Sequence, residues 1–375
     1  MYDINELVSL AKRENNMKRP YLYVNPLQGK HIPTKPENMI RMCQCLAAKI
    51  EKDYSVEKKF IIGFSETATA IASCVAENMN QAMGFVMTTR EENDEADFLY
   101  FTESHSHATE QKLDVRGMEK YLSSIERIIF VEDEVTTGNT IVKLKKEIER
   151  RFPALRVKYL IASILNSMSD NRIAELDSKG IQCIWLQKLP FEYNIGMLQK
   201  YDNCKSNHFI VSDEFSNVIK IERFGKGKTS RSVCEVKDYI ECLNDLCVSI
   251  EKNIFYGKYY EKLAVIGTEE TMYPAIKLAA YLKECNHCNV VKTHSTTRSP
   301  IMAFDTEEYP LYKRYQLKSV YDSKRITYIY NLETYDKVIL LTDSNMHSQD
   351  GLISIINALQ FEGCKDISVC QWEVE

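Results

Sequence analysis

The sequence predicts an α/β protein in which parallel β-sheets are covered by helices, and three observations support this fold class. Short apolar runs without polar alternation recur along the chain, as in strands that are buried on both faces. Segments with helical spacing of apolar residues lie between these runs. The chain has 375 residues, which is long for one hydrophobic core, so we expect two domains.

The expected elements of the first half follow from these patterns in chain order. We expect strands at residues 21–24, 60–63, 84–87, 127–131, 157–163 and 181–186, and helices at residues 36–50, 67–77 and 140–151. The helix at 36–50, for example, is predicted from the spacing of Met39, Cys43 and Leu46. The alternation is interrupted between residues 192 and 260 and then resumes.

One stretch in the interrupted segment is similar to a phosphate-binding loop. It reads Phe-Gly-Lys-Gly-Lys-Thr-Ser over residues 224–230. A true P-loop needs another glycine five positions before Gly227, and Glu222 occupies that position. We therefore interpret the stretch as a mobile basic turn.

The second half of the chain repeats the first. Residues 262–271 are similar to residues 59–67, residues 296–298 to residues 88–90, and residues 336–343 to residues 126–133. The three matches keep the same order at similar separations. We interpret them as a duplicated α/β unit, and the alternative is a chance similarity between two unrelated α/β units.

Composition and charge exclude several classes of protein. Contents of 44% hydrophobic and 27% charged residues are typical of a soluble globular protein. The net charge of -5 and the pI near 5.9 argue against a nucleic-acid-binding surface. No apolar run reaches the roughly 18 residues of a membrane helix, and residues 1–19 lack the apolar core of a signal peptide. We therefore expect a cytoplasmic protein that binds neither nucleic acid nor a membrane.

The twelve cysteines are scattered and lie mostly in apolar or helical contexts. Cys285, His287 and Cys288 have the spacing of metal ligands, but no second pair completes a tetrahedral zinc site. We expect reduced and mostly buried thiols.

The strongest chemical signature follows the strand expected at 127–131. Glu132 and Asp133 stand at its end, and a threonine-rich loop leads through Gly138 into the helix expected at 140–151. Such a loop leaves backbone N–H groups free at a helix N-terminus and so forms a cradle for an anion. The two carboxylates can accept hydrogen bonds from ribose hydroxyls or help to hold Mg²⁺. The alternative is an ordinary strand–helix turn with capping threonines.

This stretch resembles the fingerprint of type I phosphoribosyltransferases, in which four apolar residues precede two acids, two variable positions and Thr-Gly-x-Thr. The resemblance implies that Glu132 and Asp133 bind the ribose hydroxyls and a Mg²⁺ ion. It also implies a 5′-phosphate site formed by Thr136, Thr137, Gly138, Asn139 and Thr140.

The segment after the strand at 60–63 stands where this family places its pyrophosphate loop. We expect Ser65, Glu66 and Thr67 to form the loop together with the backbone N–H groups that follow. Glu66 would repel a phosphate unless Mg²⁺ or a basic group lies between them. The alternative is a plain helix start that Ser65 caps.

Further candidates rest on a resemblance to orotate-type members of the family. Those proteins carry basic residues and a histidine on a loop that closes over the diphosphate, and Arg90, His105 and His107 stand in the corresponding region. Acids replace the usual lysines of that loop. The histidines could instead bind a metal or lie on a solvated loop. By the same resemblance, Lys30 and His31 are expected in the hood over the base.

The second half has a candidate ligand site of its own, because hydroxyls and a guanidinium that suit a phosphate or carboxylate come together in Thr296, Thr297, Arg298 and Ser299. The Thr-Arg-Ser-Pro string and the upstream Gly-Thr-Glu-Glu segment resemble the TRSP domain. That domain accompanies phosphoribosyltransferase domains in bacterial tellurite-resistance and stress gene clusters. The combined resemblance covers nearly the whole chain.

The resemblance refines the expected fold to two type I phosphoribosyltransferase-like parallel-sheet domains in tandem. We expect a phosphoribosyltransferase domain at residues 1–195, a linker or hood segment at 196–258 and a TRSP-like domain at 259–375. Residues 343–348 lack the acid pair and the Thr-Gly-x-Thr turn, so the second domain is expected to be degenerate.

The implied function is that of a Mg²⁺-dependent phosphoribosyltransferase, which transfers the group between phosphoribosyl diphosphate and a nucleobase-like acceptor or catalyses the reverse cleavage. Thr136 stands where purine-salvage relatives carry an aspartate, which favours an orotate-like or unusual acceptor. One alternative is a non-catalytic sensor of phosphoribosyl nucleotides, and another is a duplicated scaffold without a ligand. A homodimer is a further expectation.

Overall fold

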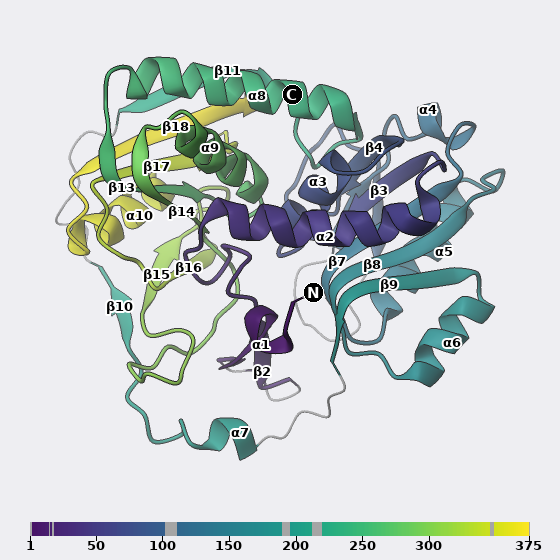
Figure 1. Ribbon diagram of the computed structural model, residues 1–375, viewed down its shortest axis with the longest axis horizontal. Coiled ribbons are helices and arrows are strands. Elements are labelled where there is room, and N and C mark those ends of the chain that lie inside the picture. The colour runs from purple at the N-terminus through teal and green to yellow at the C-terminus, as the bar shows by residue number, and fades with distance from the viewer. Residues whose placement is uncertain are drawn as a thin grey trace.

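The structure of the protein is a computed structural model that describes residues 2–14, 16, 19–101, 111–189, 196–211, 220–345 and 349–374. Two largely parallel β-sheets dominate the fold, one from each half of the chain, and helices lie between the sheets and on their outer faces (Figure 1). The α/β class predicted from the sequence is therefore confirmed. In the described part of the chain, no helix is both long enough and apolar enough to cross a membrane.

The first half builds a six-stranded sheet in the order β12-β4-β3-β7-β8-β9, in which only β12 pairs antiparallel to its neighbour. Its strands are β3 (Lys59–Gly63), β4 (Ala82–Met87), β7 (Arg127–Val135), β8 (Lys158–Asn166), β9 (Ile181–Lys188) and β12 (Cys234–Glu235). Helices α2 (Pro36–Tyr54) and α3 (Thr69–Glu77) cover one face, and α5 (Asn139–Arg151) and α6 (Asp170–Ser178) cover the other. Alternate residues of β3 serve the two faces, since Ile61 packs with α3 and Ile62 packs with α5.

The second half builds a five-stranded sheet in the order β11-β18-β17-β13-β14, in which every pair is parallel. Its strands are β11 (Ile221–Gly227), β13 (Tyr260–Gly267), β14 (Cys288–Ser295), β17 (Lys337–Thr342) and β18 (Asp366–Val374). Its helices are α8 (Val236–Ile250), which runs on into the short π-helix η2 (Glu251–Phe255), α9 (Met272–Glu284) and α10 (Asp350–Phe361). Apolar residues of α10 pack on the face of this sheet that α9 does not cover.

Smaller elements lie around the sheets. One antiparallel hairpin, β1 (Ser9–Lys12) with β2 (Tyr21–Val24), precedes α2, and another, β5 (Phe98–Phe101) with β6 (Gln111–Asp114), lies between β4 and β7. A third, β15 (Arg314–Lys318) with β16 (Ile326–Tyr330), lies between β14 and β17 and also pairs with β10 (His208–Ile210). The short helices are α1 (Ile4–Leu7), α4 (Glu119–Leu122) and α7 (Gly196–Gln199).

The two sheets repeat one another in strand order and in hydrogen bonding. The order β4-β3-β7-β8-β9 corresponds to the order β14-β13-β17-β18-β11. The N–H of Thr88 donates to the carbonyl of Gly63 at 2.8 Å, and the N–H of Thr296 donates to the carbonyl of Gly267 at 3.1 Å. Each half also places an antiparallel hairpin between corresponding sheet strands, which are β4 and β7 in the first half and β14 and β17 in the second. The three similar sequence segments thus occupy corresponding places in two similar sheets.

One hydrophobic core joins the two halves. Helices α2, α3, α8 and α9 lie between the sheets, and their apolar residues belong to one cluster with inner-face residues of both sheets (Figure 1). Ile61 of β3 and Val265 of β13 are fully buried members of this cluster, and so are Met39 of α2 and Leu278 of α9. Because burial of apolar area is the main favourable term in folding, this shared core fixes the halves against each other.

Every strand and helix expected in the first half is present, with shifted ends. The strand expected at 127–131 continues to Val135, because Glu132 and Glu134 pair in register with Ser163 and Leu165 of β8. Glu132 and Asp133, which were predicted at the end of this strand, therefore lie within it.

The interpretation of residues 224–230 as a turn was wrong for its first four residues. Phe224 pairs in register with Trp372 of β18, and Gly227 pairs with Val374, so the stretch is an edge strand of the second sheet. A Cβ atom at Gly227 would lie 2.1 Å from the indole of Trp372, so the glycine is needed for this packing. The segment from 196 to 258 contributes strands to both sheets, β11 to the second and β12 to the first.

Gly267 ends β13 directly before the loop that leads to α9. A Cβ atom there would lie 2.1 Å from the carbonyl oxygen of Thr271. We expect Gly267→Ala to lower the apparent free energy of unfolding by about 1–3 kcal/mol because the backbone must shift to make room. Urea denaturation followed by circular dichroism measures the change. Gly225→Ala is the matched control, since nothing lies within 4 Å of its Cβ position; equal losses in both variants would contradict the prediction.

Candidate functional site

The three motifs of the first half meet at one edge of its sheet. Strands β3, β4 and β7 are adjacent and parallel, so their carboxyl ends lie together. The N–H of Phe64 donates to the carbonyl of Val131 at 3.2 Å, and the N–H of Ser65 donates to the hydroxyl of Thr88 at 2.9 Å. Segments that are about 25 and 65 residues apart in the chain are thereby joined into one surface.

The threonine-rich loop after β7 has the geometry of an anion cradle. Gly138 adopts φ 68°, a left-handed conformation that favours glycine, immediately before α5. The hydroxyl of Thr137 accepts the N–H of Asn139 at 3.3 Å. Arg172 of α6 donates at 2.8 Å to the carbonyl of Thr137 and at 2.8 Å to the side chain of Asn139. A helix N-terminus and a guanidinium therefore meet here, and both favour a phosphate.

The acids at the end of β7 lie in a part-buried, charged environment. Successive strand residues point to opposite faces, so Glu132 and Glu134 lie on one face and Asp133 on the other. Arg19 of the N-terminal segment donates to both carboxylate oxygens of Glu134, at 2.8 and 2.7 Å. Burial raises the pKa of Asp133 to about 6, and the neighbouring charge of Glu134 adds to the rise.

The loop after β3 is held by groups from several parts of the chain. Gln111 of β6 donates to the carbonyl of Ser65 at 2.9 Å, and Gln28 donates to the carbonyl of Thr67 at 2.6 Å. The hydroxyl of Thr69 donates to the carbonyl of Glu66 at 3.0 Å. The Ser65–Glu66 peptide bond is cis.

Glu66 is buried between two cations. Its carboxylate forms an ion pair with Lys30 and accepts the N–H of Arg298 at 3.2 Å, and the guanidinium of Arg298 lies 3.5 Å away. Burial alone would raise the pKa of Glu66, but Lys30 and Arg298 outweigh it and lower the pKa to about 2. The basic groups that a carboxylate in a pyrophosphate loop requires are therefore present, and one of them comes from the second half.

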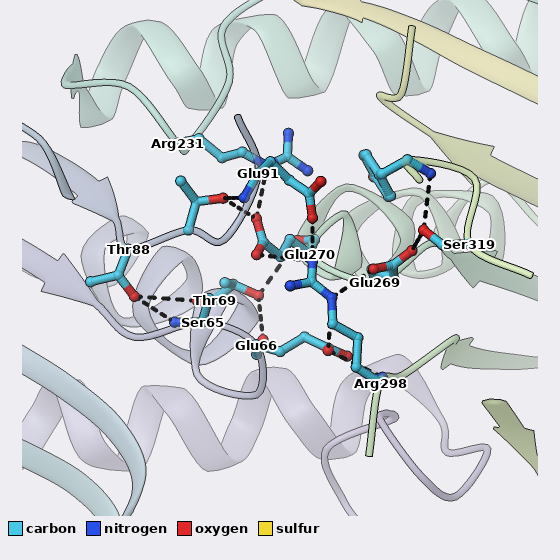
Figure 2. Close-up of polar contacts among 12 residues, drawn as sticks. Ser65, Glu66, Thr69, Thr88, Glu91, Arg231, Glu269, Glu270, Arg298 and Ser319 are labelled. Carbon is cyan, nitrogen blue, oxygen red and sulfur yellow. Dashed lines mark hydrogen bonds and ion pairs between the residues drawn. The ribbon is translucent and has the colours of Figure 1, made fainter. Parts of the chain in front are cut away.

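Arg298 is the centre of a buried ionic network between the halves (Figure 2). Besides Glu66, it bonds Glu91 of the first half and Glu269 and Glu270 of the loop after β13, with distances of 2.7 Å to Glu269 and 3.3 Å to Glu270. Arg325, at the tip of the β15–β16 hairpin, bonds Glu91 at 2.6 Å and Glu269 at 3.0 Å. The loop after β3 and the loop after β13 thus face each other across shared guanidinium groups.

A second arginine, Arg231, bonds carboxylates that follow β13 and β17 of the second sheet. Arg231 donates to Glu270 at 2.8 Å and to both oxygens of Asp343, at 2.7 and 3.1 Å. The hydroxyl of Tyr321 donates to Asp343 at 2.6 Å, and Thr271 also donates to this carboxylate. Burial raises the pKa of Asp343, but Arg231 lowers it more, so the carboxylate is ionised. Asp343 ends the segment that corresponds to residues 126–133, and it is bonded within the chain.

A cavity of about 590 Å³ opens beside this network. Thr89 and Glu91 of the first half line one side, and Arg231, Tyr321 and Asp343 of the second half line the other. The hydroxyl of Thr89, which lines the cavity, donates to Glu270 of the network at 2.9 Å.

The remaining predicted residues lie in several places. Lys30 is buried and donates to the carbonyls of Glu269 at 2.8 Å and Thr296 at 2.9 Å, so it lies between the halves. His31 is buried beside it, and burial together with the charge of Lys30 lowers its pKa to about 3. Arg90 follows β4 and is half-buried. His105 and His107 lie outside the described residues.

The string that begins at Thr296 follows β14. The hydroxyl of Thr296 accepts the N–H of Glu269 at 2.9 Å, as Thr88 does for Ser65 in the first half. Thr297 is buried, and its hydroxyl accepts the N–H of the half-buried Ser299 at 3.2 Å. A ligand role for this string stays a prediction.

Four charged residues of the site were not anticipated from the sequence. Arg19, Arg172, Arg231 and Arg325 lie outside the motifs, and only the fold brings them to the strand ends. Arg231 directly follows the basic stretch at 224–230, which was the one available signal for it.

Removing Arg231 would leave Glu270 and Asp343 without a main partner, and both side chains are less than 10% exposed. We expect Arg231→Ala to lower the apparent free energy of unfolding by about 3–5 kcal/mol at pH 7.5. The loss should shrink toward pH 5, because the unpaired carboxylates regain protons in the folded state. Thermal unfolding at the two pH values measures it. Arg150→Ala, which removes an exposed pair with Glu147, is the control and should change little. A loss independent of pH would argue against the electrostatic cause.

Comparisons with known proteins identify two families along the chain. A family described as phosphoribosyl transferase matches residues 7–184, and a family described as the TRSP domain C-terminal to that domain matches residues 226–359. No curated protein matches the chain.

Three solved structures overlap about half of the chain. Adenine phosphoribosyltransferase from Rhodothermus marinus is 12% identical with a TM-score of 0.33, and the match covers 50% of this chain and 96% of that chain. The enzyme from Giardia lamblia is 8% identical with a TM-score of 0.35, over 50% and 96%. A hypoxanthine phosphoribosyltransferase from Staphylococcus aureus is 19% identical with a TM-score of 0.26, over 44% and 81%.

Proposed function

Because the chain belongs to the family in which a TRSP domain follows a phosphoribosyl transferase domain, we propose that it is a Mg²⁺-dependent phosphoribosyltransferase. Its substrates are phosphoribosyl diphosphate and a nucleobase-like acceptor, or the corresponding nucleotide and diphosphate in the reverse direction. The observation that carries the proposal is the meeting of an acid pair, a threonine-rich loop that leads into α5 and the loop after β3 at one sheet edge.

The roles follow from the chemistry of each group. Glu132 and Asp133 accept hydrogen bonds from the ribose hydroxyls. The loop from Thr136 to Thr140 binds the 5′-phosphate through its backbone N–H groups, with Arg172 beside it. The diphosphate binds at the loop formed by Ser65, Glu66 and Thr67. Arg90 contributes positive charge, and His105 and His107 serve as candidate acid–base groups; both histidines lie outside the described residues.

The reaction needs electrostatic stabilisation above all. In the synthetic direction the bond from C1 of ribose to the diphosphate oxygen breaks, and a nitrogen of the acceptor forms the new bond to C1. Diphosphate leaves with the bonding electrons, and the acceptor nitrogen loses its proton. The site must therefore stabilise an oxocarbenium-like C1 and a departing polyanion.

The acids of β7 fit Mg²⁺. This ion is usually held by one or two carboxylates together with substrate phosphates and water. Among the described residues, no group of three or more His, Cys, Asp or Glu side chains is placed to hold a metal. We assign Glu132 and Asp133, on the resemblance, as the groups that the protein contributes. Bound there, Mg²⁺ would neutralise charge on the diphosphate.

The second half is proposed to be a degenerate copy of the same fold. Its strand order and hydrogen bonds correspond to those of the first half. The position that corresponds to Asp133 holds Asp343, which bonds Arg231 and Tyr321 instead of a ligand. We therefore assign the groups that contact the substrates to the first half. Thr136 favours an orotate-like or unusual acceptor over a purine.

Isotope-labelled phosphoribosyl diphosphate tests the function directly. We expect the protein to release labelled diphosphate in the presence of Mg²⁺ and one member of a panel of pyrimidine, purine and unusual bases. Binding without Mg²⁺-dependent release across the panel would favour the alternative, a phosphoribosyl-nucleotide sensor. If the protein does not bind phosphoribosyl diphosphate at all, only the alternative of a duplicated scaffold without a ligand remains.

The raised pKa of Asp133, about 6, predicts a pH dependence of binding. Only the ionised carboxylate accepts two hydroxyl hydrogen bonds, so affinity for phosphoribosyl diphosphate should rise between pH 5 and pH 7.5. Asp133→Asn should weaken binding at pH 7.5 by about tenfold to a hundredfold and flatten this rise. Calorimetry on both proteins is needed, because the 5′-phosphate itself titrates near pH 6. Parallel curves for the two proteins would contradict the prediction.

A further inference from the structure

Glu66 poses an electrostatic problem for the proposed site, on which this inference rests. It lies in the loop assigned to the diphosphate, and its side chain is only 8% exposed. A buried carboxylate next to a polyanion repels it unless positive charge lies close to both. Any diphosphate site here therefore depends on what neutralises Glu66.

The neutralising groups come from outside the loop. Lys30, which is 1% exposed, pairs with Glu66 from the N-terminal segment. Arg298 approaches from the end of β14 in the second half, and its backbone N–H and its guanidinium both face the carboxylate (Figure 2). The N–H lies 3.2 Å and the Nε atom lies 3.5 Å from Oε2 of Glu66.

The other arginines of the network do not neutralise Glu66 in place of Arg298, because they pair with other carboxylates. Glu66, Glu91, Glu269 and Glu270 all contact Arg298. Without it, Lys30 would be the remaining partner of Glu66, while Arg325 and Arg231 bond the other carboxylates and Asp343. The face that borders the loop would then carry excess negative charge.

We propose that Arg298 is a positioning residue of the phosphoribosyl site: the second half supplies a guanidinium that, together with Lys30, offsets the charge of Glu66 and lets the loop after β3 accept a diphosphate. The Thr-Arg-Ser-Pro string thereby completes the site of the first half in the same chain. Arg298 acts through Glu66 and does not touch the reacting atoms.

Arg325 provides a matched control within the same network. It bonds Glu91 at 2.6 Å and Glu269 at 3.0 Å, as Arg298 also bonds both residues. In the contacts of the described residues, Arg325 does not bond Glu66. Loss of Arg325 should disturb the network without leaving Glu66 unbalanced.

The experiment measures binding to the full-length chain by calorimetry with two probes, Mg²⁺–phosphoribosyl diphosphate and ribose 5-phosphate. Arg298→Ala should weaken binding of phosphoribosyl diphosphate by about tenfold or more, the effect of one unbalanced charge on an anion. Ribose 5-phosphate has no diphosphate, so its affinity should change by less than about threefold. Adding Glu66→Gln to Arg298→Ala should restore most of the lost affinity. Arg325→Ala should bind phosphoribosyl diphosphate with the affinity of the natural chain.

Several outcomes would overturn the inference. Unchanged diphosphate affinity in Arg298→Ala would do so, as would an equal loss for both probes without rescue by Glu66→Gln, which indicates a structural role alone. If Arg298→Ala does not fold, the single variant Glu66→Gln tests the inference by the same binding measurement. It should raise the affinity for phosphoribosyl diphosphate, and a fall would mean that Glu66 serves the ligand directly. A natural chain that binds neither probe would instead reject the proposed function, and this inference with it.

Discussion

Buried carboxylates at the junction of the two halves are the constraint on which the structure depends. Glu66, Glu269 and Glu270 have side chains less than 10% exposed, and uncompensated charges are very costly in such places. Arg298 contacts all three, so the strand ends of the two sheets can only lie where this guanidinium reaches both loops. The ionic network therefore fixes how the sheets face each other, while the shared apolar core supplies the cohesion.

The halves are consequently not independent units. The N-terminal segment reaches the second sheet, where Thr34 exchanges backbone hydrogen bonds of 3.1 and 2.7 Å with Thr293. Next to this contact, Lys30 connects the loop after β3 with carbonyls of the loops after β13 and β14. The segment between the halves adds one strand to each sheet. The loops at this junction are therefore held in place by contacts from both halves of the chain.

The two similar sheets differ in what occupies their strand ends. In the first half, carboxylates of β7 and the loop at Gly138, which leads into α5, lie at the strand ends. In the second half, Arg231, Thr271 and Tyr321 bond Asp343 and so occupy the corresponding acid. In the second half, these contacts tie the end of β17 to side chains of three other segments of the chain.

The sequence by itself determined the elements and the motif. Apolar runs specified the strands, because parallel strands are buried on both faces. The acid pair with its threonine loop predicted a phosphate-binding edge, and this role stays a prediction. Three similar segments also indicated the repeat that the strand orders show. The sequence could not show that β7 runs on through Glu134, because pairing with β8 decides this. Nor could it bring Arg19, Arg172 or Arg298 to the site, since ion pairs between distant segments leave no local pattern. Only the tertiary structure decided that Arg298 lies against Glu66, because that contact exists only where the strand ends of both sheets meet.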